Sequence, residues 1–235
     1  MEIFWRLILA HLLADFTFQT DYINKAKRSA LAGMFLHVFT HTIFSYILVR
    51  EYIWKTWFYI FSVPFSGLAA LLLLSAVHFT VDEVRVYMIK KLKYPDNTFS
   101  FIADQFAHLY FIFMFSPFSF ASSGLIAEKW VFMVCCLVMV THFATVFFYF
   151  LEKDFSNADF PGFDQKYFMI FERTVIWAFF MMPGIWWIGL LLLWFIQLFY
   201  VKKKRIMDVS PINFYGSIFF ASFFGILSRL AYYGF

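Results

Sequence analysis

Charged residues and cysteines are both scarce in this chain of 235 residues, and each shortage excludes a class of protein. Only 14% of the residues are charged, whereas 63% are hydrophobic and 25% are aromatic. No water-soluble core can bury that many apolar side chains. The two cysteines, Cys135 and Cys136, are adjacent within an apolar run. They therefore indicate neither a structural disulfide nor a CxxC metal site.

The short motifs of the common enzyme families are missing as well. The chain has no glycine-rich phosphate loop, GxSxG elbow, HExxH helix or kinase signature. Its basic residues flank apolar runs, an arrangement that favours anionic lipid headgroups as neighbours and gives no indication of a nucleic-acid partner. Membrane lipids are the expected partners, and a protein partner or a second copy of the chain stays open.

Apolar runs of about twenty residues recur along the whole chain, and such runs can cross a bilayer as helices. We predict an all-α, polytopic membrane bundle of about eight transmembrane helices, forming one domain over residues 1–235. The first span is expected to be a membrane helix and not a cleavable signal, because His11 and Asp15 interrupt its apolar region. The third is expected to continue past His78 as an amphipathic extension. The expected spans are residues 3–20, 31–49, 57–77, 101–120 (closed by the small-residue run 121–124), 130–151, two short helices within 168–201 divided at Pro183-Gly184, and 211–229.

The basic residues are distributed unevenly among the loops between these spans. Thirteen of the nineteen Lys and Arg residues lie in the odd-numbered loops, including the segments DYINKAKRS and KKKR (residues 202–205). Because cytoplasmic loops carry an excess of Lys and Arg, we predict that the odd loops are cytoplasmic and that both termini are extracytoplasmic.

Four short phrases in the first half of the chain each place two polar side chains four residues apart. Residues at this spacing share one face of an α-helix, so each phrase presents two potential metal ligands side by side. Five of the six histidines take part, far more than chance would give. The phrases are HLLAD (His11, Asp15), HVFTH (His37, His41), HFTVD (His78, Asp82) and DQFAH (Asp104, His108).

In the eight-span topology, all eight of these residues fall on the cytoplasmic side of their helices. Ionisable groups between membrane helices are unfavourable unless they face a partner, so eight at one depth predict a shared site. We interpret it as a site for one or two divalent metal ions in a four-helix bundle over residues 1–120, supported by the helices of residues 121–235. Mixed His and Asp ligands suit Zn²⁺, and also Mn²⁺ or Fe²⁺, better than Mg²⁺ or Ca²⁺.

A hydrogen-bond or proton network is the alternative to a metal site, because single His and Asp pairs on membrane helices commonly bond across helices. Gln19 and Gln105 are expected to orient the ligands or to pair across helices, and His142, which has no partner at four residues, to support the ligands or to make a helix contact. Glu172 and Arg173 are interpreted as a structural pair.

The segment HLLADFTFQTDYINKAK resembles the opening of an uncharacterised family of bacterial membrane proteins, domain of unknown function 3307. The resemblance extends over nearly the whole chain and implies a location in the bacterial inner membrane, but it brings no established activity. The further landmarks are His37, His78 with Asp82, the element Asp104-Gln105-x-x-His108, Glu172-Arg173, the basic residues 203–205, and Tyr215-Gly216-Ser217.

Two classes of function fit these observations. The first is a metal-dependent hydrolase acting on a lipid or lipid-linked substrate, with Asp15, Asp82 or Asp104 as a candidate general base. The second is a non-enzymatic subunit of a membrane complex, stabilised by a structural metal or polar network. A transporter fits less well, because the outer half of the first four spans offers only scattered Ser, Thr and Tyr.

Overall fold

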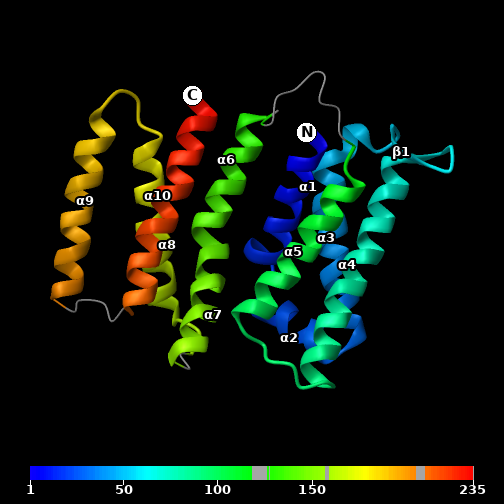
Figure 1. The fold of residues 1–235 in the computed structure, drawn as a ribbon, viewed down its shortest axis with the longest axis horizontal. Coiled ribbons are helices and arrows are strands. Elements are labelled where there is room, and N and C mark those ends of the chain that lie inside the picture. Colours follow the sequence, from blue (N-terminus) through cyan, green and yellow to red (C-terminus); the bar gives the residue numbers. More distant parts are fainter. Residues whose placement is uncertain (118–125, 127, 157–158, 205–209, 235) are drawn as a thin grey trace. The chain divides into compact units, whose positions relative to one another are not determined.

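The computed structural model describes residues 1–117, 126, 128–156, 159–204 and 210–234. These residues confirm the all-α class and form nine helices, when each continuous run (α1 with η1, α3 with η2, and α6 with η3 and α7) is counted as one, together with a single two-stranded hairpin. The contacts divide the chain into two compact units, Met1–Val131 and Phe132–Phe235. Figure 1 shows the elements of both units.

Unit 1 is a ring of four helices with shorter elements at its ends. Helix α1 contacts α3, α3 contacts α4, α4 contacts α5, and α5 returns to α1. The elements are α1 (Glu2–Leu12), the π-helical turn η1 (Leu13–Thr17), α2 (Asp21–Ser29), α3 (Leu31–Val49), the 3-10 turn η2 (Arg50–Tyr52), β1 (Thr56–Ile60), β2 (Val63–Ser66), α4 (Gly67–Lys90), α5 (Thr98–Phe115) and the start of α6 (Lys129–Val138).

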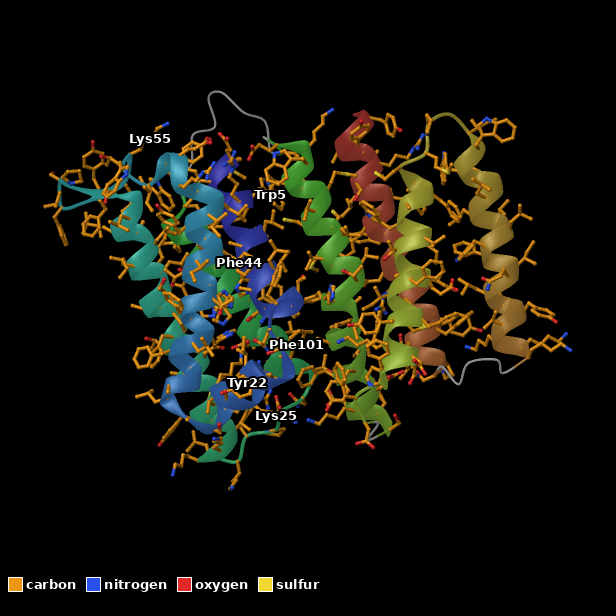
Figure 2. All side chains as sticks on the ribbon, turned by 180° about the vertical axis from the view of Figure 1, so that it is seen from behind. Trp5, Tyr22, Lys25, Phe44, Lys55 and Phe101 are labelled. Atoms are coloured by element: carbon orange, nitrogen blue, oxygen red, sulfur yellow. The ribbon has the colours of Figure 1, made fainter. Side chains whose placement is uncertain are left out.

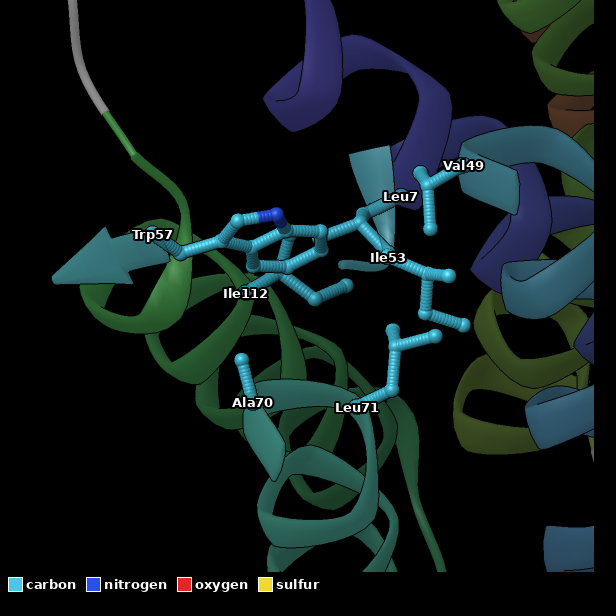
Figure 3. Close-up of a cluster of buried hydrophobic side chains, with 7 residues drawn as sticks. All are labelled: Leu7, Val49, Ile53, Trp57, Ala70, Leu71 and Ile112. Carbon is cyan, nitrogen blue, oxygen red and sulfur yellow. The ribbon is translucent and has the colours of Figure 1, made fainter. Parts of the chain in front are cut away.

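The two ends of this ring differ in character. The N-terminus and the hairpin lie at one end, and α2 lies at the other (Figure 1). Lys55 marks the hairpin end, whereas Tyr22 and Lys25 mark the opposite end (Figure 2). A cluster of apolar side chains closes the hairpin end, and Trp57 in it donates a hydrogen bond from Nε1 to the carbonyl oxygen of Tyr52 at 3.0 Å. Figure 3 shows the cluster: Leu7, Val49, Ile53, Trp57, Ala70, Leu71 and Ile112.

The prediction of a helix starting at residue 57 is wrong for its first ten residues. Residues 56–66 form an antiparallel hairpin, and helix α4 begins only at Gly67, where the Ser66 hydroxyl caps it by accepting from Ala69 N. Phe61 and Ser62 turn the chain with positive φ angles of 46° and 68°. Short apolar runs rich in aromatic residues have no period that separates a strand from a helix. The predicted extension past His78 is confirmed, because α4 continues to Lys90.

The basic segment after the first span is also helical. Thr20 begins α2 by accepting a hydrogen bond from Ile23 N at 3.3 Å, as residues at helix N-termini commonly do. Helix α2 then packs against α3 at Gly33, where a Cβ atom would come within 2.2 Å of the Ala26 carbonyl carbon. Only glycine permits this close approach, and the contact holds α2 at the end of unit 1 opposite the hairpin.

Unit 2 contains the rest of α6, the π-helical turn η3 (Met139–Phe143), α7 (Ala144–Ser156), α8 (Phe163–Phe180), α9 (Trp186–Lys203) and α10 (Pro211–Tyr233). The predicted division of the long apolar block is confirmed, because α8 ends before Pro183 and Gly184 has a φ of 67°. The predicted end of the fourth span at residue 120, the small-residue run 121–124 and Arg205 lie outside the described residues.

Glu172 and Arg173 are held by different helices, Glu172 by α9 and Arg173 by α7 and α10, and the described ion pairs do not join them. The Glu172 carboxylate accepts from Trp194 Nε1 at 2.6 Å. The fully buried Arg173 donates to Thr145 Oγ1 at 2.5 Å and to Ser217 Oγ at 3.1 Å. Both residues therefore join the helices of unit 2, although they do so separately.

Six helices among the described residues are long and apolar enough to cross a membrane, which identifies a multi-pass membrane protein. The other two expected spans are helical but fall short of these criteria. Helix α1 has 11 residues and η1 five, and the 18 residues of α8 include Asp164, Lys166, Glu172 and Arg173. The six are Leu31–Tyr52, Gly67–Lys90, Thr98–Phe115, Lys129–Ser156, Trp186–Lys203 and Pro211–Tyr233.

Candidate metal centre

The four pairs predicted from spacing each lie side by side, and all four turn into the same interior of unit 1. The Nε2 to carboxylate distances are 3.6 Å for His11 and Asp15, 3.4 Å for His78 and Asp82, and 3.7 Å for His108 and Asp104. The rings of His37 and His41 have centroids 4.6 Å apart. Helical periodicity alone therefore located one buried cluster.

Asp15 joins helix α1 to helix α3. It lies in the π-helical turn η1, a kind of turn that is frequent at functional sites. Its Oδ1 atom is 3.1 Å from His41 Nε2 and 3.3 Å from His37 Nε2. The Asp15 side chain is only 8% exposed, so these contacts are shielded from water.

Asp82 plays the corresponding part on helix α4. One oxygen, Oδ2, is 3.0 Å from His37 Nε2 and 3.4 Å from His78 Nε2. The other, Oδ1, is 3.6 Å from His108 Nε2 on α5. Asp82 thus connects histidines of three helices.

Two groups of side chains in this cluster have ligand atoms within 4.8 Å of one another, the spacing that allows them to hold a metal ion. The first group is Asp15, His37, His41 and His78, and the second is His78, Asp82 and His108. If His78 serves the second group, each group supplies three protein ligands. Three protein ligands and one open position is the arrangement of catalytic zinc sites.

The separations between ligand atoms match the edges of a coordination polyhedron. Bonds of about 2.05 Å from Zn²⁺ to nitrogen or oxygen give tetrahedral edges of about 3.3 Å. The His37 Nε2 atom lies 3.0 to 3.4 Å from Asp82 Oδ2, Asp15 Oδ1 and His78 Nε2. The distances from His37 to Asp15 and His78, which belong to its own group, therefore fit ligands of one ion, whereas Asp82 belongs to the second group.

Hydrogen bonds alone cannot explain the contacts of His37. A ring nitrogen has either one hydrogen or one lone pair in the ring plane, so it makes one good hydrogen bond. Yet His37 Nε2 faces carboxylate oxygens, which require a donor, and the Lys27 ammonium at 3.4 Å, which requires an acceptor. A cation among the ligand atoms would take the His37 lone pair and balance the two carboxylates, whereas the Lys27 ammonium pairs with Asp82 Oδ1 at 3.7 Å.

Gln105 links the cluster to two residues that lie outside both groups. Its amide nitrogen donates to Asp15 Oδ2 at 3.1 Å and to Asp104 Oδ2 at 3.3 Å. Its oxygen is 3.2 Å from His11 Nε2, which donates if that nitrogen carries the hydrogen. In that state His11 Nε2 has no lone pair for a metal. Gln105 therefore contacts three members of the cluster, and the orienting role expected of it stays a prediction.

Asp104 is held by a residue that the spacing analysis did not assign to the site. Its Oδ2 accepts from Arg85 at 3.1 Å, whereas its buried Oδ1 accepts no hydrogen bond among the described residues. Arg85 lies seven residues after His78 and three after Asp82, on the same helical face. That spacing is the signal that could have identified it.

Lys27 was also missed, and no local pattern indicates it. Helix α2 places its ammonium 3.7 Å from Asp82 Oδ1, with the side chain only 10% exposed. The structure does not test the supporting role predicted for the two remaining residues. Gln19 Oε1 is buried without a hydrogen-bond partner in the described part of the chain, and His142 lies in unit 2, where Nδ1 is 3.1 Å from Thr141 Oγ1. Their supporting role stays a prediction.

The cluster lies inside unit 1, near the end that carries α2. At about 1.5 Å per residue, His37 is about 9 Å and His41 about 15 Å from the start of α3. On one side, a cavity of about 20 Å³ reaches His11, His41, His78 and His108. One water molecule needs about 10–15 Å³ on this measure, so the cavity accommodates a single water.

The comparisons with known proteins give one finding. A family model described as "Protein of unknown function (DUF3307)" matches residues 3–133, a range that contains every member of the cluster. No curated protein and no solved structure matches the chain.

Proposed function

The chain belongs to the DUF3307 family, whose description names no activity, and we propose its function from the cluster itself. It is a membrane-embedded, metal-dependent hydrolase that acts on a lipid or lipid-linked ester. The supporting observation is the convergence of imidazole nitrogens and carboxylate oxygens from three helical segments, η1, α3 and α4, at 3.0 to 3.4 Å around His37. Zn²⁺, Mn²⁺ or Fe²⁺ is the ion that this donor set favours.

An open position beside the ligands supports hydrolysis over a purely structural ion. The cavity at His41, His78 and His108 has room for one water, and a bound divalent ion lowers the pKa of a water ligand toward neutrality. A structural ion would have all positions filled by protein.

Asp104 is the carboxylate to which we assign the role of general base. It lies outside both ligand groups, and its Oδ1 is buried and free of hydrogen bonds among the described residues. Arg85 and Gln105 hold the other oxygen and so fix the carboxylate. As the water oxygen bonds to the ester's phosphorus or carbonyl carbon, its proton passes to Asp104, and Asp104 gives that proton to the leaving oxygen as the bond between the leaving oxygen and the phosphorus or carbon breaks.

The proposed membrane arrangement has eight spans, with α1 and α8 crossing as partners of the six apolar helices. The end of unit 1 that carries α2 faces the cytoplasm, and both chain termini lie outside. Buried charges on α1 and α8 suit helices that face the bundle interior and not the lipid. The cluster is then within reach of the cytoplasmic leaflet.

A hydrolysis assay tests the activity. Detergent-purified protein loaded with Zn²⁺ or Mn²⁺ is expected to cleave either 4-nitrophenyl phosphate esters or 4-nitrophenyl acyl esters, and a chelator should remove this activity until metal is restored. Release of 4-nitrophenol is the readout, and protein carrying both His37→Ala and His41→Ala is the blank. Turnover that is equal in the blank, or absent with both ester classes, would count against the hydrolase.

Lys27 supports a second candidate, a non-enzymatic subunit of a membrane complex. Its ammonium lies 3.4 Å from His37 Nε2 and 3.7 Å from Asp82, so it can act as the internal cation of a polar network. In that case the cluster stabilises the helix bundle without metal. Metal content distinguishes the two candidates.

A further inference from the structure

A second cavity, between α2 and α4, carries an unusual concentration of positive charge. Its volume is about 70 Å³, several times the 10–15 Å³ that one water needs, so a group of several heavy atoms fits. The lining residues are Lys27, Arg28, Asp82, Arg85, Val86, Ile89 and Lys90. Four cations therefore surround a space whose one carboxylate, Asp82, also belongs to the cluster.

This cavity connects the solvent-facing side of α2 with the candidate metal centre. Arg28, with 38% of its side chain exposed, and the exposed Lys90 form its outer part. Asp82, 4% exposed and 3.0 Å from His37, lies at its inner part. A group bound here would lie next to the ligand atoms.

The arginines already hold one anion in the way that a phosphate is held. Asp96 accepts from Arg28 NH1 at 2.8 Å and from Arg85 NH2 at 3.0 Å, so two guanidinium groups converge on one carboxylate. Arg85 Nε is buried and has no hydrogen-bond partner among the described residues, which leaves a donor for a further oxygen. Guanidinium groups match phosphate oxygens in geometry and charge.

The charge balance of the loaded site points to the same ligand. Two divalent ions would carry four positive charges, whereas Asp15 and Asp82 supply two negative charges. When the four cations of the cavity are added, together with the carboxylates of Asp96 and Asp104 that pair with its arginines, the region still keeps a positive surplus that a phosphate dianion would compensate.

We propose that the cavity between α2 and α4 binds the phosphate group of the substrate, an inference that rests on the proposed function and specifies a phosphate ester as its substrate class. The phosphate enters past Arg28 and Lys90 and reaches the cluster at Asp82. The recognition chemistry is shared by a lipid phosphomonoester and by free phosphate.

Calorimetric titration of the detergent-purified full chain tests the proposal. The probes are inorganic phosphate, dihexanoyl phosphatidic acid and, as a lipid without net charge, dihexanoyl phosphatidylcholine. The Arg28→Gln, Lys90→Gln double variant is expected to bind phosphate and phosphatidic acid at least tenfold more weakly than wild type, with unchanged metal content. The matched control is Lys25→Gln with Lys91→Gln, which removes the same charge from exposed positions outside the cavity lining and should bind like wild type.

Tighter binding of phosphatidic acid than of phosphate would identify a lipid headgroup as the ligand, and equal binding would identify the phosphate group alone; both support the proposal. Absence of phosphate binding in wild type, or equal weakening in the two double variants, would overturn it. Failure of the hydrolase is a separate result. If the protein cleaves no ester but its phosphate binding still depends on Arg28 and Lys90, this binding site stands and the proposed enzyme does not. Conversely, acyl-ester cleavage without a phosphate effect keeps the enzyme and removes this site.

Discussion

Replacing His37 and His41 together by alanine is expected to remove the metal ion held by the first ligand group from the purified protein. The two residues supply half of the four-membered ligand group, and His37 Nε2 is the atom around which Asp15, Asp82 and His78 converge. With both imidazoles gone, one carboxylate and one imidazole remain in that group, too few to hold an ion against water. Elemental analysis by mass spectrometry gives the metal content per chain.

His142→Ala is the matched control, since His142 lies in unit 2 and contacts Thr141. It should retain the wild-type metal content. Because the double variant can fail to fold, Asp15→Asn provides a second test that keeps the side-chain size but removes a ligand charge; its metal affinity should fall at least tenfold. Equal metal content in the double variant and in His142→Ala would refute the ligand assignment.

Replacing Asp104 by asparagine is expected to lower the rate of ester hydrolysis by about 10²- to 10⁴-fold, the usual contribution of a general base. Asparagine keeps the size of the side chain and can still accept from Arg85, but it cannot take a proton from water. Because Asp104 lies outside both ligand groups, metal content should stay at the wild-type level. The measurements are turnover, metal content and melting temperature of the same preparation.

Asp164→Asn serves as the control, because it removes an exposed carboxylate on α8. A stable, metal-loaded Asp104→Asn protein without activity supports catalysis. Joint loss of metal and thermal stability would instead assign Asp104 to the architecture of the bundle, as expected when the half-buried Arg85 loses one of its two carboxylate partners. Wild-type behaviour in all three measurements would exclude both roles.

The features of the site that the sequence predicted correctly are the local ones. A spacing of four residues determines which side chains share a helical face, so the adjacency of His78 with Asp82 and of Asp104 with His108 followed from periodicity alone. The break at Pro183-Gly184 was likewise predictable from the backbone chemistry of those two residues.

The features that were missed depend on tertiary packing or on weak local signals. Lys27 reaches His37 only because Gly33 lets α2 approach α3, and no spacing pattern encodes that contact. Arg85 shared the face of Asp82, but on an amphipathic extension a basic residue is ordinarily a solvent-exposed one. Most of the hairpin at residues 56–66 was predicted to be helical, because its apolar composition is compatible with a strand and with a helix.

The most direct test of the metal centre is X-ray absorption at the metal K-edge of detergent-purified wild-type protein, after loading with Zn²⁺, Mn²⁺ or Fe²⁺ and removal of unbound ions. We expect at least one ion per chain, with nitrogen and oxygen ligands at about 2.0–2.2 Å and the outer-shell scattering of imidazole rings. Protein that binds none of the three ions, or an ion without imidazole ligands, would contradict the assignment and leave Lys27 as the cation of the cluster.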